Sequence, residues 1–300
     1  MSSEVSKENN ASLEQVNLID KQDSRFGDMW YSFKKNKIAV VGLVIAIFLI
    51  FVAIFGKFFT PFDPNLTEQD ILNPRPPSQE HWFGTDEQGR DIFSRIINGA
   101  SVSIFVGVAS VGFSLLLGMV LGAIAGYYGG KIDTIIMRFI DIILAIPSIL
   151  LAMCLILTLG AGVGKIIMAI GFISIPQYAR IIRGSILSEK ENDYVEAARI
   201  VGCSDFSIIF KTILPNIVSG IIVRAALGIS SAVLEVAALG YLGLGIKPPQ
   251  AEWGTMLSES RKFVIQAPHT LLFPGLAITL TVLAFNLLGD GLRDVLDPKS

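Results

Sequence analysis

Long apolar runs alternate with polar segments along this chain, and the alternation predicts six helices that cross a membrane. The runs extend roughly over residues 38–59, 96–130, 135–159, 166–182, 213–239 and 268–289. A helix needs ~20 apolar residues to span the ~30 Å hydrocarbon core of a bilayer. A backbone in that core must satisfy its own hydrogen bonds, so each run is expected to be helical. The pattern therefore predicts an all-α integral membrane protein.

The polar segments divide the chain into four regions. Residues 1–37 form a polar tail that is expected to be disordered over its first 24 residues, and residues 38–99 contain the first span and a long loop. Residues 100–290 form a core of five helices that is interrupted by a charged segment, and residues 291–300 form a second tail. The start of the chain does not fit a cleaved signal peptide, so the first span is expected to be retained.

Composition excludes a soluble domain and gives no sign of a nucleic-acid or metal site. Hydrophobic residues make up 52% of the chain and charged residues 17%, whereas soluble domains carry about 25% charged residues. The net charge of −2 provides no basic face for nucleic acid. Cys154 and Cys203 have no zinc-like spacing and are expected to be unpaired thiols.

The distribution of lysine and arginine predicts the orientation. With the N-terminus in the cytoplasm, the segments on that side carry 15 of these residues and the outer segments carry eight. Positive residues favour the cytoplasmic side. Both termini and residues 183–211 are therefore expected in the cytoplasm, and the loops at residues 60–99 and 240–262 are expected outside.

Charged side chains within the spans are candidates for a solute pathway. They are Arg138, Asp141, Arg224 and Glu235. Arg138 and Asp141 are three residues apart and are expected to pair on one helix face, and Arg224 and Glu235 also fall near one face. A charge at the bilayer centre costs ~2.5–3.5 kcal/mol, so such groups face protein or water. These four residues could either form structural ion pairs or line the solute pathway, and the sequence does not distinguish the two roles.

The second run has a small residue at every fourth position. These residues are Ser110, Ser114, Gly118, Gly122 and Gly126. Such a stripe lets another backbone approach closely, so we expect it to pack against a second helix. The serines have the alternative of lining a pore.

The charged segment contains two helix signals separated by a glycine. Asp193 is a candidate N-cap, and Glu196 completes a capping box. Gly202 is expected to end this helix, and Ser204 is expected to cap a second short helix. The apolar stripe of that second helix comprises Phe206, Ile209, Phe210 and Ile213. The pair either docks into a partner or lies on the membrane as an amphipathic connector.

This segment resembles the E-A-A loop of binding-protein-dependent ABC importer permeases. The pattern matches Glu196-Ala197-Ala198, Gly202 and Ile213-Leu214-Pro215, although Thr212 stands where the broad pattern has its Ile. The resemblance implies a type I ABC importer permease fold with coupling helices at about residues 193–212, which seat in a cleft of a separate ATPase. The residues that it assigns to ATPase coupling are Asp193, Glu196, Ala197, Ala198, Gly202 and Pro215.

Two further motifs resemble the peptide and nickel branch of this family. One is the pattern H-x-F-G-T-D-x-x-G-R-D in the first outer loop. It is matched by His81, Phe83, Gly84, Thr85, Asp86, Gly89, Arg90 and Asp91. The other, over residues 242–254, matches L-G-L-G…P-P…E-W-G. The matches cover about residues 25–298 and are similar to the C-type permease of dipeptide and oligopeptide systems.

The resemblance implies the partners and the location. These are a B-type permease subunit, two cytoplasmic ATPase subunits that bind ATP and Mg, an extracytoplasmic binding protein, a peptide substrate and the lipid of a bacterial or archaeal cytoplasmic membrane. This chain is expected to bind no cofactor and to have no catalytic site. Residues 160–165 are not a phosphate loop, because Leu159 and Ile166 replace its required residues. Alternatives are a nickel or glutathione permease, an ion-driven carrier and a membrane scaffold without transport.

Overall fold

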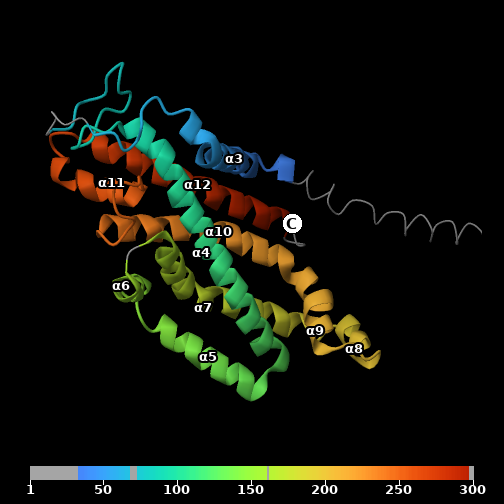
Figure 1. The fold of residues 1–300 in the computed structure, drawn as a ribbon. Coiled ribbons are helices and arrows are strands. Elements are labelled where there is room, and N and C mark those ends of the chain that lie inside the picture. Colours follow the sequence, from blue (N-terminus) through green and yellow to red (C-terminus); the bar gives the residue numbers. More distant parts are fainter. Residues whose placement is uncertain (1–32, 68–72, 161, 297–300) are drawn as a thin grey trace, which may run out of the picture.

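The computed structural model of the protein describes residues 33–67, 73–160 and 162–296. Predictions for residues 1–32 and 297–300 lie outside this range. No β-strand occurs among the described residues, where residues 85 and 91 form one isolated bridge. The elements are α3 (Lys37–Phe55), η2 (Gly56–Phe58), α4 (Ile92–Tyr128), α5 (Gly130–Leu144), α6 (Ser148–Leu159), α7 (Val163–Glu189), α8 (Asp193–Ile200), α9 (Asp205–Ser207), η3 (Ile208–Ile213), α10 (Leu214–Tyr241), α11 (Trp253–Ser260), η4 (Arg261–Phe263) and α12 (His269–Leu296) (Figure 1).

The all-helical membrane fold is confirmed, with one correction. Five helical segments of the described chain are long and apolar enough to cross a membrane. The expected span over residues 135–159 is instead formed by α5 and α6, which are bent by 89° relative to each other. Pro147 lies in the break, and a proline pushes the residue before it out of the helical region. The prediction of one continuous helix there is wrong, because the segment consists of two helices that meet at a sharp bend.

The contact between α4 and α7 forms the centre of the molecule. A Cβ atom added at Gly118 would lie 2.6 Å from the Cβ of Tyr178, and one added at Gly122 would lie 2.5 Å from the carbonyl oxygen of Ala179. The helices therefore touch where α4 has no side chain. This confirms that the small-residue stripe packs against a second helix, and both of its serines are buried.

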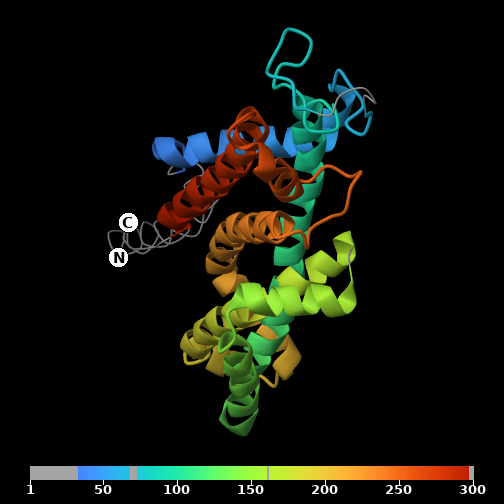
Figure 2. The same cartoon turned by 90° about the vertical axis from the view of Figure 1, so that its left-hand side faces the viewer.

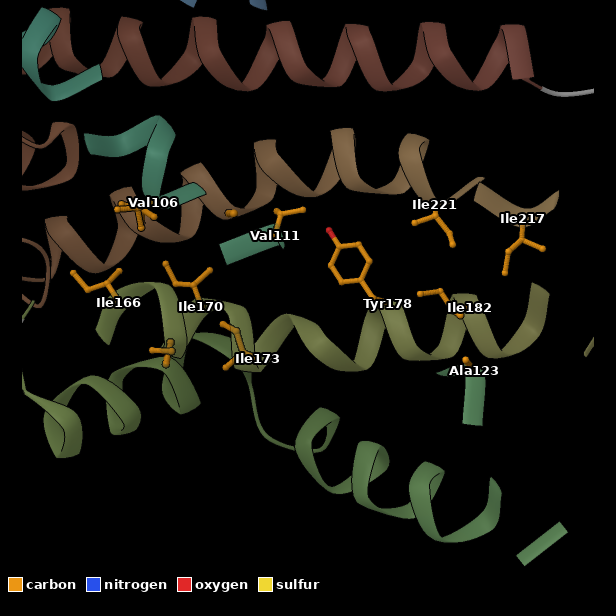
Figure 3. Packing of buried hydrophobic residues seen from close by; sticks show 14 of the residues in the cluster. Val106, Val111, Ala123, Ile166, Ile170, Ile173, Tyr178, Ile182, Ile217 and Ile221 are labelled. Carbon is orange, nitrogen blue, oxygen red and sulfur yellow. The ribbon is translucent and has the colours of Figure 1, made fainter. Parts of the chain in front are cut away.

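The helices α7 and α10 also pack closely, with a glycine of α10 against a side chain of α7. In Figure 3, the side chain of Tyr178 points from α7 toward α10, with Ile182 and Ile221 beside it. A Cβ atom at Gly228 would lie 2.0 Å from the hydroxyl oxygen of Tyr178. Lipid is as apolar as these side chains, so tight packing rather than burial from water holds such helices together.

The helices α3 and α12 form a second packed pair. Gly42 contacts Leu287, and an added Cβ atom there would lie only 2.7 Å from the Cβ of Leu287. At one end of the pair, Asn36 Nδ2 donates to Asp294 Oδ2 at 2.8 Å. Figures 1 and 2 place α3 and α12 on one side of α10 and place α5 on the opposite side.

The two ends of the bundle carry different segments. In Figure 1, α11 and the loop before α4 lie at one end, and α8 and α9 lie at the other. The start of α3 and the end of α12 lie toward the α8 end. The two candidate sites from the sequence are therefore at opposite ends of the long helices.

Candidate functional site

The helix α8 begins one residue after the expected cap residue. Asn192 is the N-cap, with extended backbone angles, and Asp193 is the first helical residue. The prediction of a capping box formed by Asp193 and Glu196 is therefore wrong. The Asn192 side chain makes no capping hydrogen bond, and its Nδ2 donates to Glu189 Oε2. Asp193 and Glu196 still lie in the first turn, where negative charge interacts favourably with the helix dipole.

Gly202 ends α8 as predicted. Its φ of +85° lies in the left-handed region, which costs residues with a Cβ atom ~1–2 kcal/mol. The Cys203 N–H donates to the Ala198 carbonyl and the Gly202 N–H donates to the Arg199 carbonyl, both at 3.0–3.1 Å. These two bonds form a Schellman motif, which satisfies the terminal carbonyls and fixes the angle of the turn.

The predicted second short helix is not separate from the fifth span. Ser204 caps α9 through the Ser207 N–H, and α9, η3 and α10 then run on as one 37-residue segment, Asp205–Tyr241. The residues of η3 make π-type turns just before Pro215. A proline lacks the N–H of a regular turn and clashes with the carbonyl four residues earlier, and the wider π turn accommodates both effects.

Apolar side chains are exposed around the Gly202 turn. Ile200, Val201 and Phe206 are 79%, 82% and 68% exposed. The expected stripe is divided, because Ile209 and Ile213 are buried while Phe206 and Phe210 are exposed. Exposed apolar groups that cluster in this way mark interaction sites. Ala197 is exposed and Ala198 is half-buried, so small side chains lie next to the exposed apolar groups.

The turn is held against the spans by several polar contacts. Tyr194 donates its hydroxyl hydrogen to Glu189 Oε2 at 2.7 Å and accepts a hydrogen bond from Asn216 Nδ2 at 3.0 Å. Burial, followed by the hydrogen bond to Glu189, raises the pKa of Tyr194. Tyr127 at the end of α4 donates to Asp205 Oδ1 at 2.8 Å. The turn is therefore connected to α4, α7 and α10 at once.

At the opposite end, the outer-loop motif forms a buried ionic cluster. Arg90 Nε donates to Asp86 Oδ2 at 2.6 Å, and Arg90 Nη2 donates to Glu259 Oε2 at 2.7 Å. Arg95 lies 3.4 Å and 3.6 Å from the same two carboxylates. Arg90 and Arg95 are 2% and 1% exposed. The motif did not reveal Arg95 or Glu259, because their places depend on the packing of α4 against α11.

The other motif residues fix the shape of the loop. Asp91 accepts a hydrogen bond from the Ser94 N–H, which caps α4, and its second oxygen lies 2.9 Å from His81 Nδ1. The Thr85 hydroxyl accepts from the Arg75 N–H, and the Phe83 ring stacks on Phe273 of α12. Gly84 and Gly89 have positive φ angles. The loop is a rigid structural unit at the start of α4.

The second outer motif attaches α11 to α4 and α10. Glu252 is fully buried and accepts hydrogen bonds from the Gly254 N–H, the Thr255 N–H and hydroxyl, and the hydroxyl of Ser103. Burial raises the pKa of Glu252, and these hydrogen bonds oppose the shift. Trp253 Nε1 donates to the Ile96 carbonyl at 3.0 Å. The motif is therefore structural in this chain.

The charges within the spans differ from expectation in their partners. Asp141 pairs with Arg180 of α7, not with Arg138, and Arg138 is exposed. The Arg138–Asp141 pairing is therefore wrong, because the neighbouring helix supplies a closer cation. Arg224 contacts Gln177, and neither it nor Glu235 forms an ion pair among the described residues.

Comparison with known proteins decides the family. Residues 118–300 match the family described as binding-protein-dependent transport system inner membrane component. The chain belongs to this family. Residues 24–77 match the N-terminal transmembrane domain of oligopeptide transport permease C. This permease-family chain is therefore a multi-pass membrane protein and a transport component of an ABC importer.

Three similar relatives have names that state their cargo. A dipeptide transport system permease protein of Alkalihalophilus pseudofirmus is 47% identical over 92% of this chain and 90% of its own. A glutathione transport system permease protein of Pectobacterium atrosepticum is 45% identical over 91% of this chain and 90% of its own. A glutathione permease of Escherichia coli is 44% identical over 96% of both chains.

Proposed function

We propose that this chain is the transmembrane permease subunit of an ATP-driven importer for small peptides and forms half of the translocation pathway. The single observation that carries the coupling role is the rigid turn at Gly202, which presents exposed apolar side chains and is connected to three spans. A docking element must transmit force, and a turn with fixed hydrogen bonds moves as a unit with the helices it joins. An amphipathic connector on the membrane needs no such connections.

The coupling residues then have distinct roles. Ala197 and Ala198 allow a partner surface to approach, Gly202 sets the angle, and Glu196 and Asp193 present negative charge at the start of α8. Pro215 lies where the turn enters α10. ATP and Mg bind to the partner ATPases, which supply the catalysis, while this chain converts their movement into access for the solute.

The orientation follows from the positive charges. The α8 end faces the cytoplasm together with both chain ends, and the loop with the ionic cluster faces outward toward a binding protein. A B-type permease provides the other half of the pathway in a bacterial cytoplasmic membrane. The rigid outer loop of residues 81–91 gives that side a fixed surface.

Peptides are the favoured cargo. The relatives are a dipeptide permease and glutathione permeases, and glutathione is itself a tripeptide. Both cargoes are small, carry carboxylates and an ammonium group, and contain amide bonds. The bent α5–α6 pair and the charges on α7 and α10 are available for a pathway between two permeases, whereas a scaffold without transport needs neither.

Substitution of Gly202 tests the proposal. Gly202→Asp introduces a Cβ atom at φ +85° where nothing lies within 4 Å, so it distorts the turn without a clash. In proteoliposomes with the partner subunits, we expect ATP-driven peptide uptake to fall by about tenfold or more while ATP hydrolysis continues. A tenfold fall corresponds to a loss of ~1.4 kcal/mol of coupling free energy.

Gly243→Asp is the matched control. Gly243 also has a positive φ, +80°, and open space around it, but it follows α10 near the opposite end. It should leave uptake per hydrolysed ATP close to that of the unaltered protein. Normal coupling in Gly202→Asp, in a complex that still assembles, contradicts the proposal.

A further inference from the structure

Arg224 is a cation within a predicted span whose charge has no counter-ion among the described residues. It lies near the middle of the helical segment Asp205–Tyr241. Its Nη2 donates to Gln177 Oε1 at 2.6 Å, and its Nε is shielded from solvent with no hydrogen-bond partner in the described chain. Placing such a charge at the bilayer centre costs ~2.5–3.5 kcal/mol. Charged side chains in a span therefore face other protein groups or a water-filled cavity, and they are candidates for a functional site.

A cavity of about 500 Å³ lies beside this side chain, between α7, α10 and α12. Its polar lining includes Ser219, Arg224 and Arg293, and its apolar lining includes Ile181, Val223 and Leu227. The residues around it thus carry two guanidinium groups, and none of those that line it is an Asp or Glu. The site is a cationic cavity with partly apolar walls, and this setting strengthens attraction for an anion.

The hydrogen bond from Arg224 to Gln177 orients the guanidinium without neutralising it. The Nη2 group carries two protons, and Gln177 accepts one of them. The Nε is shielded from solvent, but Nη1 is not, and no described residue accepts a hydrogen bond from it. The Nη1 group and the second Nη2–H therefore remain as an end-on fork. This fork matches the spacing of the two oxygens of a carboxylate, which arginine binds in bidentate geometry.

We propose that this cavity binds the carboxylate of the transported solute, with Arg224 as the principal contact and Arg293 as a second cation at the end of α12. The inference rests on the proposed peptide import and names a contact within that pathway. Arg224 lies ten residues into α10, which is ~15 Å along the helix from its first residue. That depth favours a solute over a lipid phosphate at the membrane surface.

Charge-selective thiol labelling tests the site directly. Ser219→Cys is made in a Cys154→Ser, Cys203→Ser background, and the complete transporter is placed in phosphatidylcholine nanodiscs. An anionic and a cationic methanethiosulfonate reagent are compared. We expect Arg224→Gln to lower the ratio of anionic to cationic labelling rate by roughly fivefold, and Arg224→Lys to preserve it, because a unit charge that lines the same cavity is removed only in the first.

Ser101→Cys is the matched control, because Ser101 is exposed on α4, a helix that contributes no residue to the lining of the cavity. Its labelling ratio should not change with Arg224→Gln. An unchanged ratio at Ser219→Cys, in a complex that elutes as assembled, overturns the proposal. Because labelling does not require transport, this result is independent of the proposed function, which a separate assay of ATP-driven uptake tests.

A ligand experiment identifies the source of the carboxylate. A short peptide with a free C-terminal carboxylate should slow labelling of Ser219→Cys, whereas its C-terminal amide should not, and Arg224→Gln should abolish the difference. Equal protection by acid and amide contradicts a carboxylate site. Protection by anionic phosphatidylglycerol without peptide, with no further effect of the peptide, assigns the cavity to lipid and also contradicts the proposal.

Discussion

Single side chains with several hydrogen bonds determine the outer end of the molecule. Glu252 is a clear example, because it is fully buried and four donors point at its two oxygens. Leaving a buried donor without an acceptor costs ~1–3 kcal/mol. The sequence motif identified this residue, but its role depends on Ser103, which lies 149 positions away and carries no sequence signal.

Replacement of this carboxylate should therefore destabilise the protein. Glu252→Gln turns one acceptor oxygen into an NH₂ group that faces a donor, so we expect the free energy of unfolding to fall by ~1–3 kcal/mol. Thermal unfolding of the purified protein in detergent measures the change. Glu80→Gln, an exposed substitution in the same outer loop, is the control, and equal stability of the two variants would show that the buried bonds contribute little.

The pH dependence provides a second measure of the same side chain. Burial raises the pKa of Glu252, so between its ordinary and its raised pKa the native state binds more protons than the unfolded state. Stability should therefore fall as pH rises through that window. Glu252→Gln should remove this part of the slope, and an unchanged slope in that variant would contradict the assignment.

At the scale of elements, the sequence predicted those features that depend on local pattern. The apolar runs predicted the spans, the small-residue stripe predicted the α4–α7 contact, and Gly202 predicted the end of α8. Prediction from the sequence was wrong where contacts between neighbouring elements determine the structure. The bend at Pro147 breaks the third span, Asp141 pairs with Arg180 across helices, and α9 continues into α10 because π turns accommodate Pro215.

The α4–α7 contact can be tested with two glycines of one helix. A Cβ atom at Gly122 meets backbone of α7 at 2.5 Å, whereas one at Gly112 meets nothing within 4 Å. We expect Gly122→Ala to destabilise the protein by ~1–3 kcal/mol through forced separation of the helices. Gly112→Ala should be neutral or stabilise by up to ~1 kcal/mol, because alanine favours a helix over glycine.

Thermal unfolding in detergent distinguishes these two substitutions. The same ranking should appear in the amount of protein that remains in the membrane after expression. If both alanines have the same effect on stability, close packing of α4 on α7 is not what the stripe provides.

At the scale of the whole molecule, the long helices connect the α8 turn at one end with the ionic cluster and α11 at the other. The turn at α8 is connected to α4, α7 and α10, and α4 and α10 extend to the ionic cluster and to α11 at the other end. A movement imposed at α8 therefore reaches the outer loops through continuous helices. The cavity beside Arg224 lies between α7, α10 and α12, so two of the three helices that hold the α8 turn also line it.

Site-specific cross-linking in living cells tests the central claim most directly. A photoreactive amino acid replaces Val201 at the α8 turn in one variant and Ile265, next to α11, in another; both side chains are apolar and more than four-fifths exposed, at 82% and 89%. The account predicts that Val201 cross-links to an ATPase subunit identified by mass spectrometry and that Ile265 does not. An ATPase captured from Ile265 but not from Val201 would contradict it.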